Sequence, residues 1–375
     1  MLVNGRDTRS IRLVAPPREA PVPEIIDQTR LPHELRFVRL ETLEDAENAI
    51  REMWVRGAPL IGVTAAYGMA LGARTDPSDS GLESAARRLS DTRPTAVNLE
   101  WALSAMVEKL GPLPPTDRQA AAFEHADSLA EADVAACRAI GLHGSEVLER
   151  LAAERTPAGR LQILTHCNAG WLATVDWGTA LAPVYRAHRS GLPLHVWVSE
   201  TRPRNQGAGL TAWELAEEGI PHTVIPDNAS GHLLRTGRVD AVITGTDRTT
   251  SAGDVCNKIG TYMKAVAAHD CEVPFYAAVP GSSIDWELGE GEAASIAIEE
   301  RDGSEVSEVR GLAPDGRMTS VRITPAGSRV ANFGFDVTPA RLVTGLITER
   351  GVCAASQEAL ASLFPDRSSG EDAPG

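Results

Sequence analysis

The spacing of hydrophobic positions changes near residue 155 of the chain. Before that point, apolar residues recur three and four positions apart in the segments Ala65–Gly72, Ala120–Arg138 and Ile140–Ala153. This spacing places apolar side chains on one face of a helix. A strand pair is expected ahead of these helices, with Leu35–Leu40 as its clearest member. The first part of the chain should therefore be mostly helical, with a short antiparallel sheet.

After residue 155, short apolar runs alternate with helical segments. Unbroken apolar strands separated by single helices are typical of a parallel sheet covered on both faces. The sequence thus predicts an α/β fold, a doubly wound sheet whose ligands bind beyond the carboxyl ends of the strands. The predicted strands, each with the helix that follows it, are Leu161–Thr165 with Thr179–Arg189, Leu194–Val198 with Ala208–Glu218, His222–Ile225 with Ser230–Arg235, Ala241–Thr244 with Lys258–His269, and Phe275–Val279.

These patterns divide the chain into three regions. Residues 1–154 form the smaller helical domain, residues 155–367 the α/β domain, and residues 368–375 a disordered tail, with Thr156–Gly159 as the linker between the domains. Within the second domain, a polar hairpin region is expected over Glu299–Arg322 and a closing helix near Thr338–Arg350.

Composition narrows the classes of partner and compartment. The net charge of −15 argues against general affinity for nucleic acid or for anionic membranes, although a local cationic cluster can still bind a phosphate. No apolar run is long enough for a signal peptide or a transmembrane helix. The five cysteines are scattered, so neither a disulfide framework nor a zinc cluster is expected. We therefore expect a cytoplasmic protein.

Polar residues follow the predicted strands, and one of them is a cysteine. Leu161–Thr165 leads into His166, Cys167 and Asn168. A cysteine between a strand and a helix lies where the helix dipole and backbone N–H groups favour a thiolate. A lone cysteine is more often a small buried residue. Its polar neighbours make a functional site the better interpretation here.

Two further strand ends carry candidate chemistry. Gln206 and two arginines follow Leu194–Val198, where they suit a phosphate or sugar hydroxyls, although a solvated turn is the alternative. Asp247 follows Ala241–Thr244 and is either a catalytic carboxylate or a helix cap. Asn257 and Lys258 are expected to open the next helix, where a cation and helix N-terminal amides would meet a phosphate.

The helical half adds two arginines. Arg56, Gly57 and Ala58 precede an apolar helix, an arrangement suited to an anion, and Arg93 lies beside a turn. Taken alone, both arginines would be surface residues. The sequence lacks GxGxxG, GxxxxGK[ST], HExxH and GxSxG, so motifs for nicotinamide, nucleoside triphosphates, zinc peptidases and ordinary α/β-hydrolases are missing.

The chain resembles the methylthioribose-1-phosphate isomerase family from about Ile25 to Val352. The segments that carry the resemblance are Arg56–Gly62, Thr165–Gly170, Glu200–Pro203 with Gln206–Gly207, Asp247–Arg248, Asn257–Thr261, Ile298–Arg301 and Phe335–Ala340. The resemblance implies a Rossmann-like C-terminal domain, a homodimer, no metal and no organic cofactor. It also implies a sugar-phosphate substrate and an aldose–ketose isomerisation, as in methionine salvage. By the same resemblance, Cys167 and Asp247 are catalytic, and the substrate is held by Arg56, Gly57, Ala58, Arg93, Gln206, Asn257 and Lys258.

The chain departs from the family pattern near the site, at Trp171, Ser199, Asn205, Gly209 and Thr246. These departures leave the 5-substituent of the sugar open. The alternatives are 5-deoxyribose 1-phosphate and ribose 1,5-bisphosphate; the latter requires a second cationic pocket, for which Arg204 is the candidate. A non-enzymatic alternative is a regulatory subunit like those of the translation-initiation exchange factor, which share the family's fold.

Overall fold

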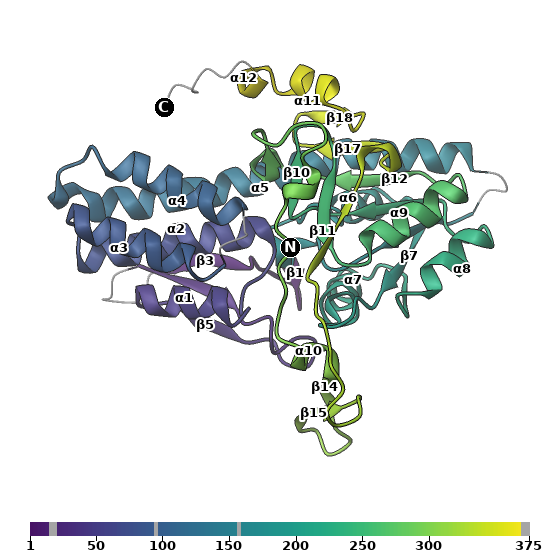
Figure 1. Cartoon of the computed structure of the whole chain (residues 1–375), viewed down its shortest axis with the longest axis horizontal. Coiled ribbons are helices and arrows are strands. Elements are labelled where there is room, and N and C mark those ends of the chain that lie inside the picture. The colour runs from purple at the N-terminus through teal and green to yellow at the C-terminus, as the bar shows by residue number, and fades with distance from the viewer. Residues whose placement is uncertain (15–20, 94–96, 156–158, 369–375) are drawn as a thin grey trace.

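The structure is a computed structural model that describes residues 1–14, 21–93, 97–155 and 159–368. A helical part and an α/β part lie side by side, and the N-terminus lies between them (Figure 1). Within the described ranges, no helix is both long enough and apolar enough to span a membrane. Residues 156–158 of the predicted linker Thr156–Gly159 and residues 369–375 of the predicted tail 368–375 lie outside the described residues, whereas Ser368 ends a short helix.

The helical part packs around one buried helix. Helix α2 (Ala58–Thr75) is buried along almost its whole length and contacts α1, α3, α4 and α5. A capping box between Thr42 and Asp45 begins α1. The predicted small antiparallel sheet is present, with a strand at Phe37–Arg39 that is shorter than expected. The elements are β1 (Leu2–Val3), β2 (Arg6–Asp7), β3 (Ile11–Val14), β4 (Val22–Ile26), β5 (Phe37–Arg39), α1 (Leu43–Arg51), α3 (Asp79–Ser90) and α4 (Val97–Leu110).

The two helices predicted at Ala120–Arg138 and Ile140–Ala153 are one. Helix α5 runs without a break over Pro115–Glu154. Its glycines serve close packing, because a Cβ at Gly144 would lie 2.3 Å from Pro183 of the neighbouring helix. The first half of α5 packs in the core of the helical part, and the second half packs against the large sheet. The division of the chain at residue 154 stays a prediction.

The predicted doubly wound α/β fold is confirmed. Within the described residues, a seven-stranded sheet has the order β18-β17-β12-β9-β6-β7-β8 and is parallel except for the pair β17–β18. Its strands are β6 (Leu161–Thr165), β7 (Leu194–Ser199), β8 (His222–Ile225), β9 (Ala241–Thr244), β12 (Phe275–Ala278), β17 (Gly345–Thr348) and β18 (Gly351–Cys353). The helices between them are α6 (Ala182–Arg189), a π-helical turn (Gly207–Thr211), α7 (Ala212–Glu217), α8 (Ala229–Arg235) and α9 (Thr261–Asp270).

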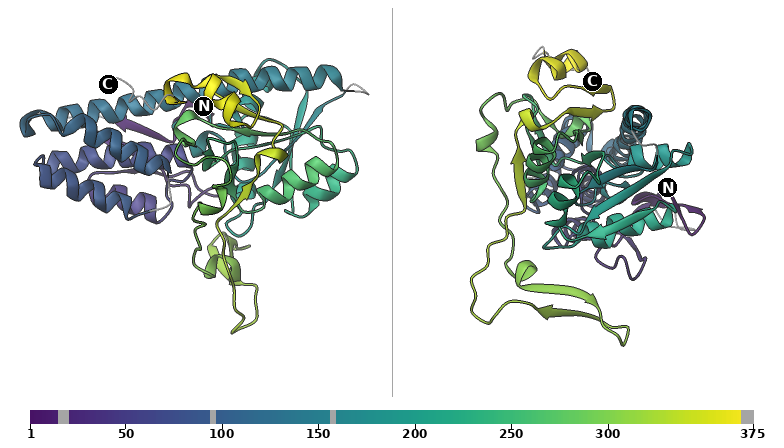
Figure 2. Two further views of the ribbon diagram at one scale, coloured as in Figure 1. Left: turned by 45° about the horizontal axis from the view of Figure 1, so that its top comes forward. Right: turned by 90° about the vertical axis from the view of Figure 1, so that its right-hand side faces the viewer.

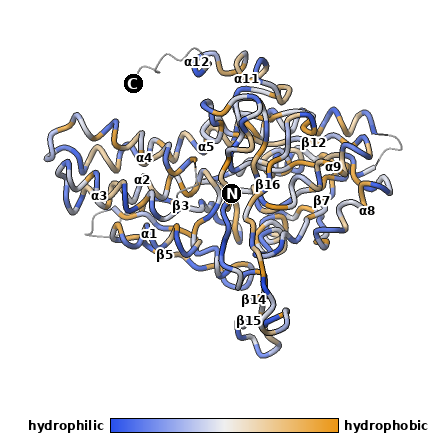
Figure 3. Tube along the Cα trace, in the orientation of Figure 1, coloured by the Kyte–Doolittle hydropathy of each residue, from blue (hydrophilic) through white to orange (hydrophobic). Residues whose placement is uncertain are grey.

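Successive residues of the central strands enter cores on opposite faces of the sheet. Ile163 packs with α5 and α6, whereas Leu164 packs with α8 and α9. Ile243 and Val242 of β9 are divided in the same way. Both faces of the sheet are covered by apolar cores, so the sequences of these strands are continuously hydrophobic. Figure 3 shows the chain coloured by hydropathy, with hydrophobic stretches alternating with hydrophilic ones in both halves of the molecule.

Two predicted helices are wrong in whole or in part. Val255–Lys258 is strand β11, so Asn257 and Lys258 do not open a helix. Helix α9 begins only at Thr261, because Gly260 adopts a φ of 99° and the Asp336 carboxylate accepts from the N–H groups of Gly260 and Tyr262. Thr338–Arg350 holds strand β17 instead of a closing helix. The apolar residues Leu342, Val343, Leu346 and Ile347 are spaced as in a helix, but pairing with β12 makes Gly345–Thr348 a strand.

A second sheet and a projecting hairpin complete the fold. Among the described residues, the second sheet has the order β13-β10-β11-β16, with β13 (Ile284–Asp285), β10 (Arg248–Thr250), β11 (Val255–Lys258) and β16 (Phe335–Thr338). The polar hairpin region contains β14 (Glu308–Leu312) and β15 (Met318–Arg322), which project away from the rest of the chain (Figure 2). Short helices α10 (Ser304–Ser307), α11 (Gln357–Leu363) and α12 (Pro365–Ser368) remain.

Candidate functional site

Three neighbouring strands of the large sheet deliver the loops of the candidate site. Cys167 follows β6, Gln206 follows β7 and Asp247 follows β9. Since β9, β6 and β7 are adjacent and parallel, their carboxyl ends lie at one edge of the sheet. Residues about 40 positions apart along the chain thereby meet.

The helical part supplies the opposite wall. Gly57 is the N-cap of α2 with a φ of 91°, and a Cβ there would lie 2.4 Å from the carbonyl oxygen of Ala173. Only glycine fits this approach, which sets the N-terminus of α2 against the short helix Trp171–Ala173. The apolar helix predicted after Arg56 is therefore present, and its start borders the loop His166–Gly170 that contains Cys167, here called the cysteine loop.

One cavity collects every residue predicted for the site. Its lining is polar in large part and comes from both halves of the chain. The predicted residues in the lining are Arg56, Gly57, Ala58, Arg93, Cys167, Gln206, Asp247, Asn257 and Lys258. These residues therefore border one cavity, and their roles as catalytic and substrate-binding residues stay predictions.

Cys167 is held on three sides. Its N–H donates to Thr201 Oγ1 at 2.8 Å, and its carbonyl oxygen accepts from the Thr211 hydroxyl at 2.7 Å. Its thiol donates to Gln206 Oε1 at 3.2 Å. The residue has a φ of 62°, a left-handed conformation that is uncommon outside glycine. The loop does not open an α-helix, because only the one-turn helix Trp171–Ala173 follows it and α6 begins at Ala182.

A buried glutamate, Glu214, is hydrogen-bonded to the backbone just after this loop. Glu214 Oε1 accepts from the N–H of Leu172 at 2.8 Å, and its other oxygen accepts from the Tyr185 hydroxyl. Burial raises the pKa of Glu214 to about 7. A side chain at Gly170 would overlap this carboxylate. The family segment Thr165–Gly170 therefore ends at a position where the packing leaves room only for glycine.

Asp247 lies between β9 and β10, which excludes the helix-cap alternative. Its N–H donates to the Cys256 carbonyl at 3.0 Å, and its side chain borders the cavity. Burial raises the pKa of Asp247, while the cations Lys258, Arg93 and Arg56 act in the opposite direction. A carboxyl group in this setting retains its proton at higher pH than an ordinary aspartate.

Arg56 donates most of its hydrogen bonds to the cysteine loop. Its Nη1 donates to the carbonyl of Asn168 at 2.9 Å, its Nη2 to the Asn168 side chain, and its Nε to Gln28 Oε1 at 3.2 Å. Burial lowers the pKa of Arg56, while Cys167 and Glu214 oppose that effect. The guanidinium thus joins the helical half to the residue next to Cys167.

Lys258 and Asn257 approach from β11. The Lys258 ammonium lies 4.7 Å from the centre of the Phe335 ring, its cross-strand partner. Burial lowers the pKa of Lys258, with Cys167 and Asp247 acting against the shift. The Asn257 amide donates to Thr261 Oγ1 at 3.0 Å. A partly desolvated ammonium of this kind interacts strongly with an anion that enters the cavity.

Several lining residues were not among the predicted site residues. They are Met53, Pro59, His166, Asn168, Ala169, Ala173, Thr174, Thr179, Gly245, Thr246 and Phe335. His166 and Asn168 had a signal, since they flank Cys167. Phe335 had one too, because it opens the family segment Phe335–Ala340. Met53 had none. Within the described residues, no group of three or more histidine, cysteine, aspartate or glutamate side chains is arranged to hold a metal.

Comparison with known proteins gives consistent results for this chain. The model of the initiation factor 2 subunit family matches residues 54–355. A methylthioribose-1-phosphate isomerase from Rhodospirillum rubrum is 59% identical over 371 residues, which cover 98% of this chain and 94% of that protein.

Two solved structures share the fold at substantial identity. A 5-methylthioribose 1-phosphate isomerase from Pyrococcus horikoshii superposes with a TM-score of 0.78 at 39% identity, covering 96% of each chain. A structure described as the translation initiation factor eIF-2B, subunit delta, from A. fulgidus superposes with a TM-score of 0.76 at 37% identity, covering 96% of this chain and 100% of that one.

Proposed function

Because the chain belongs to the initiation factor 2 subunit family, and within it to the methylthioribose-1-phosphate isomerases, we propose that it isomerises 5-methylthioribose 1-phosphate to 5-methylthioribulose 1-phosphate. The observation that carries this proposal is the shared cavity. A thiol, a carboxyl group and several cations border one and the same cavity. The reaction is an aldose–ketose isomerisation in the salvage of methionine.

The phosphate is assigned to the cationic side of the cavity. Arg93, Lys258 and the N-terminus of α2 at Gly57 and Ala58 all border it. Guanidinium groups, an ammonium and helix N-terminal amides are the groups that bind phosphate most effectively in proteins. Gln206 and Asn257 contribute amides that suit the sugar hydroxyls.

The anomeric phosphate constrains the mechanism. An ordinary aldose isomerase opens the ring to a free aldehyde, which here would require the phosphate to leave. We assign to Asp247 the protonation of the ring oxygen, since its raised pKa suits a proton donor. The bond between C1 and the ring oxygen then breaks, and the phosphate stays on C1. Cys167, which borders the same cavity, acts as the base or assists it.

Two routes complete the reaction from this point. In one, a hydride moves from C2 to the electron-poor C1 while the C2 hydroxyl loses its proton, which leaves a ketone at C2. In the other, a base removes the C2 proton as the ring opens, giving a phosphoenolate that is protonated at C1. Turnover in D₂O separates them, because only a proton-transfer route through an exchanging base places deuterium at C1.

The identity of the 5-substituent is tested by measuring kcat/KM separately for three sugars. We expect kcat/KM to be highest for the 5-methylthio sugar, lower for the 5-deoxy sugar and lowest for ribose 1,5-bisphosphate. Arg204, the candidate for a second phosphate, is already paired with Glu305 at 2.6 Å. That pairing disfavours a substrate with a charged 5-position. A higher kcat/KM for the bisphosphate would overturn this assignment.

The regulatory-subunit alternative is less well supported. A scaffold has no requirement for Cys167 and Asp247 to border the same cavity, which they do. The A. fulgidus relative carries a translation-factor description, but its likeness shows shared fold and ancestry and does not assign a role to this cavity. Absence of turnover on all three sugars would favour the scaffold interpretation.

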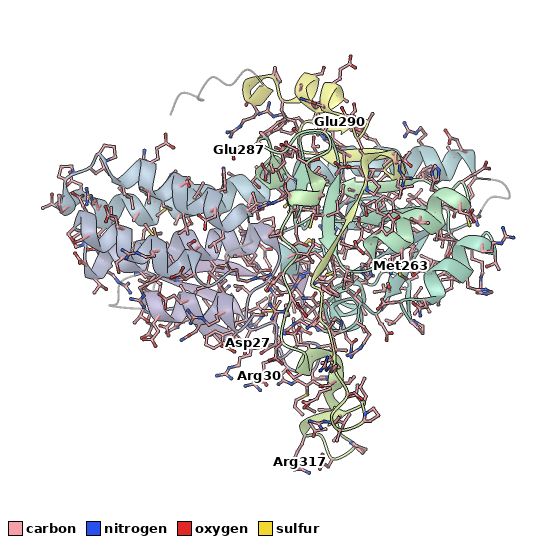
Figure 4. The ribbon with its side chains drawn as sticks, viewed as in Figure 1. Asp27, Arg30, Met263, Glu287, Glu290 and Arg317 are labelled. Atoms are coloured by element: carbon pink, nitrogen blue, oxygen red, sulfur yellow. The ribbon has the colours of Figure 1, made fainter. Side chains whose placement is uncertain are left out.

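We also propose a homodimer, as the family resemblance implies. Tyr262, Met263 and Val266 on α9 are exposed apolar residues beside a groove between α8 and α9, and Met263 is labelled in Figure 4. Such a patch favours association with another surface. The mass measured by light scattering should be that of two chains, and Met263→Glu should shift it toward one.

A cytoplasmic location is likewise proposed. The described residues hold only free cysteines, at Cys137, Cys167, Cys256, Cys271 and Cys353. Free thiols are the usual state in a reducing compartment. Fractionation of cells that express the tagged chain tests the assignment.

A further inference from the structure

Arg93 combines a guanidinium held by an ion pair with a buried Nε donor that has no partner among the described residues. Its Nη2 donates to Glu299 Oε2 at 2.9 Å, across 206 positions of sequence. Its Nε is buried and has no hydrogen-bond partner among the described residues. Leaving a charged donor unpaired in the interior is costly, so such a group usually has a function. Arg93 also borders the cavity beside Asp247.

Glu299 is itself held on both its side chain and its backbone. Arg301 Nη1 contacts Glu299 Oε1 at 2.7 Å. The carbonyl oxygen of Glu299 accepts from the N–H of Gly334 at 2.8 Å. The carboxylate therefore offers Arg93 a fixed anchor, one oxygen for each guanidinium.

The ion pairs continue outside the cavity lining, toward the loop that contains Gln206. Arg301 Nη2 contacts Glu305 Oε1 at 3.0 Å, and Arg204 Nη1 contacts the same oxygen at 2.6 Å. Arg204 lies two residues before Gln206, which accepts from the Cys167 thiol. A chain of charged contacts thus joins the helical half, through Arg93, to the loop that holds the catalytic candidate.

The charges within this network of ion pairs, which contains Arg93, Arg204, Arg301, Glu299 and Glu305, do not cancel. Its guanidinium groups outnumber its carboxylates by one, so Glu299 can anchor Arg93 while the cluster stays cationic. The side chains of Arg93 and Glu299 are only 11% and 22% exposed. Solvent and salt screen such a pair less than a surface pair.

We propose that Glu299 is a positioning residue that orients Arg93 for the substrate phosphate. This inference rests on the proposed function, because the role of Arg93 as a phosphate contact does. Glu299 makes no contact with the reacting carbons in this account. It fixes one side of the Arg93 guanidinium so that the remaining donors stay directed toward the anion.

The Glu299→Gln variant tests the inference. Glutamine keeps the size of the side chain but loses the charge-assisted contact, so Arg93 is held less firmly. We expect KM to rise about tenfold and kcat to change by less than about threefold, since a phosphate contact acts on binding. Glu299→Asp should restore part of the affinity, because it keeps the charge with a shorter reach. An unchanged KM would overturn the inference, and a lowered KM would show that Glu299 competes with the phosphate.

Two controls isolate the route through Arg93. In an Arg93→Ala background, Glu299→Gln should have no further effect on KM; a persistent tenfold effect would mean that Glu299 acts by another route. Asp315→Asn removes a carboxylate paired with Arg317 at the tip of the hairpin (Figure 4) and should leave KM unchanged. If Asp315→Asn also raised KM, the change in net charge would explain the effect of Glu299→Gln.

Calorimetric titration with inorganic phosphate separates this inference from the proposed function. We expect Glu299→Gln to weaken phosphate binding about tenfold whichever sugar is turned over. If the wild-type chain isomerises none of the sugars but the phosphate result holds, the proposed function fails and the positioning role stands. If wild-type turnover is normal and neither KM nor phosphate affinity changes in the variant, the positioning role alone fails.

Discussion

Replacing Gly57 with alanine tests how the helical half is set against the cysteine loop. At a φ of 91° and a ψ of 133°, a residue with a Cβ is strained by about 1–3 kcal/mol. The added Cβ would also lie 2.4 Å from the Ala173 carbonyl oxygen, and such overpacking typically costs about 1–3 kcal/mol more. Gly57→Ala should therefore lower the free energy of unfolding by about 2–6 kcal/mol.

Gly219→Ala is the matched control. Gly219 also has a positive φ, of 68°, but a Cβ there would meet no atom within 4 Å. Its cost should be limited to the backbone, about 1–2 kcal/mol. The difference between the two variants isolates the close approach of α2 to Ala173.

Urea unfolding and steady-state kinetics measure the two consequences. Gly57→Ala should unfold at a lower urea concentration than Gly219→Ala with a similar m-value. Its kcat/KM should fall at least about tenfold, because relief of the clash moves the start of α2 away from the cavity. Equal unfolding midpoints together with unchanged kcat/KM would refute the reasoning.

Two further predictions follow from the site. Cys167→Ala and Asp247→Asn should each lower kcat by about a hundredfold or more while leaving the unfolding midpoint nearly unchanged; near-normal turnover would remove that residue from the mechanism. Because burial raises the pKa of Glu214 from 4.5 to about 7, the folded state binds this proton more tightly, so stability falls as pH rises from about 4.5 to 7. The loss reaches about 3 kcal/mol, and Glu214→Gln should reduce it, so that the variant unfolds at higher urea than the wild type at pH 8; equal pH dependence of the two proteins would contradict this.

The sequence predicted those parts of the fold that depend on local pattern. The runs at Leu161–Thr165 and Ala241–Thr244 are buried on both faces, and that burial is visible as unbroken hydrophobicity. The residues after such strands meet at one edge for geometric reasons alone. The proximity of Cys167, Gln206 and Asp247 therefore followed once the sheet was recognised.

What the sequence did not predict depends on contacts distant along the chain. Lys258 was assigned to a helix because pairing of β11 with Phe335 and its neighbours leaves no local signal. The apolar residues of Thr338–Arg350 have helix-like spacing, and only the place of Gly345–Thr348 beside β12 makes that part a strand. Similarly, nothing near Arg93 in the sequence indicates Glu299 as its partner.

Helix α5 has a consequence for how the molecule unfolds. Ala122 and Ala126 belong to the core of the helical half, whereas Ile140, Val147 and Leu148 belong to the core beneath the large sheet. A chain that ended at residue 154 would leave the second set uncovered in water and prone to aggregate. Melting either core would also withdraw support from the helix that the other core needs. The two halves should accordingly unfold in one cooperative transition, with the site lost in the same step as the fold.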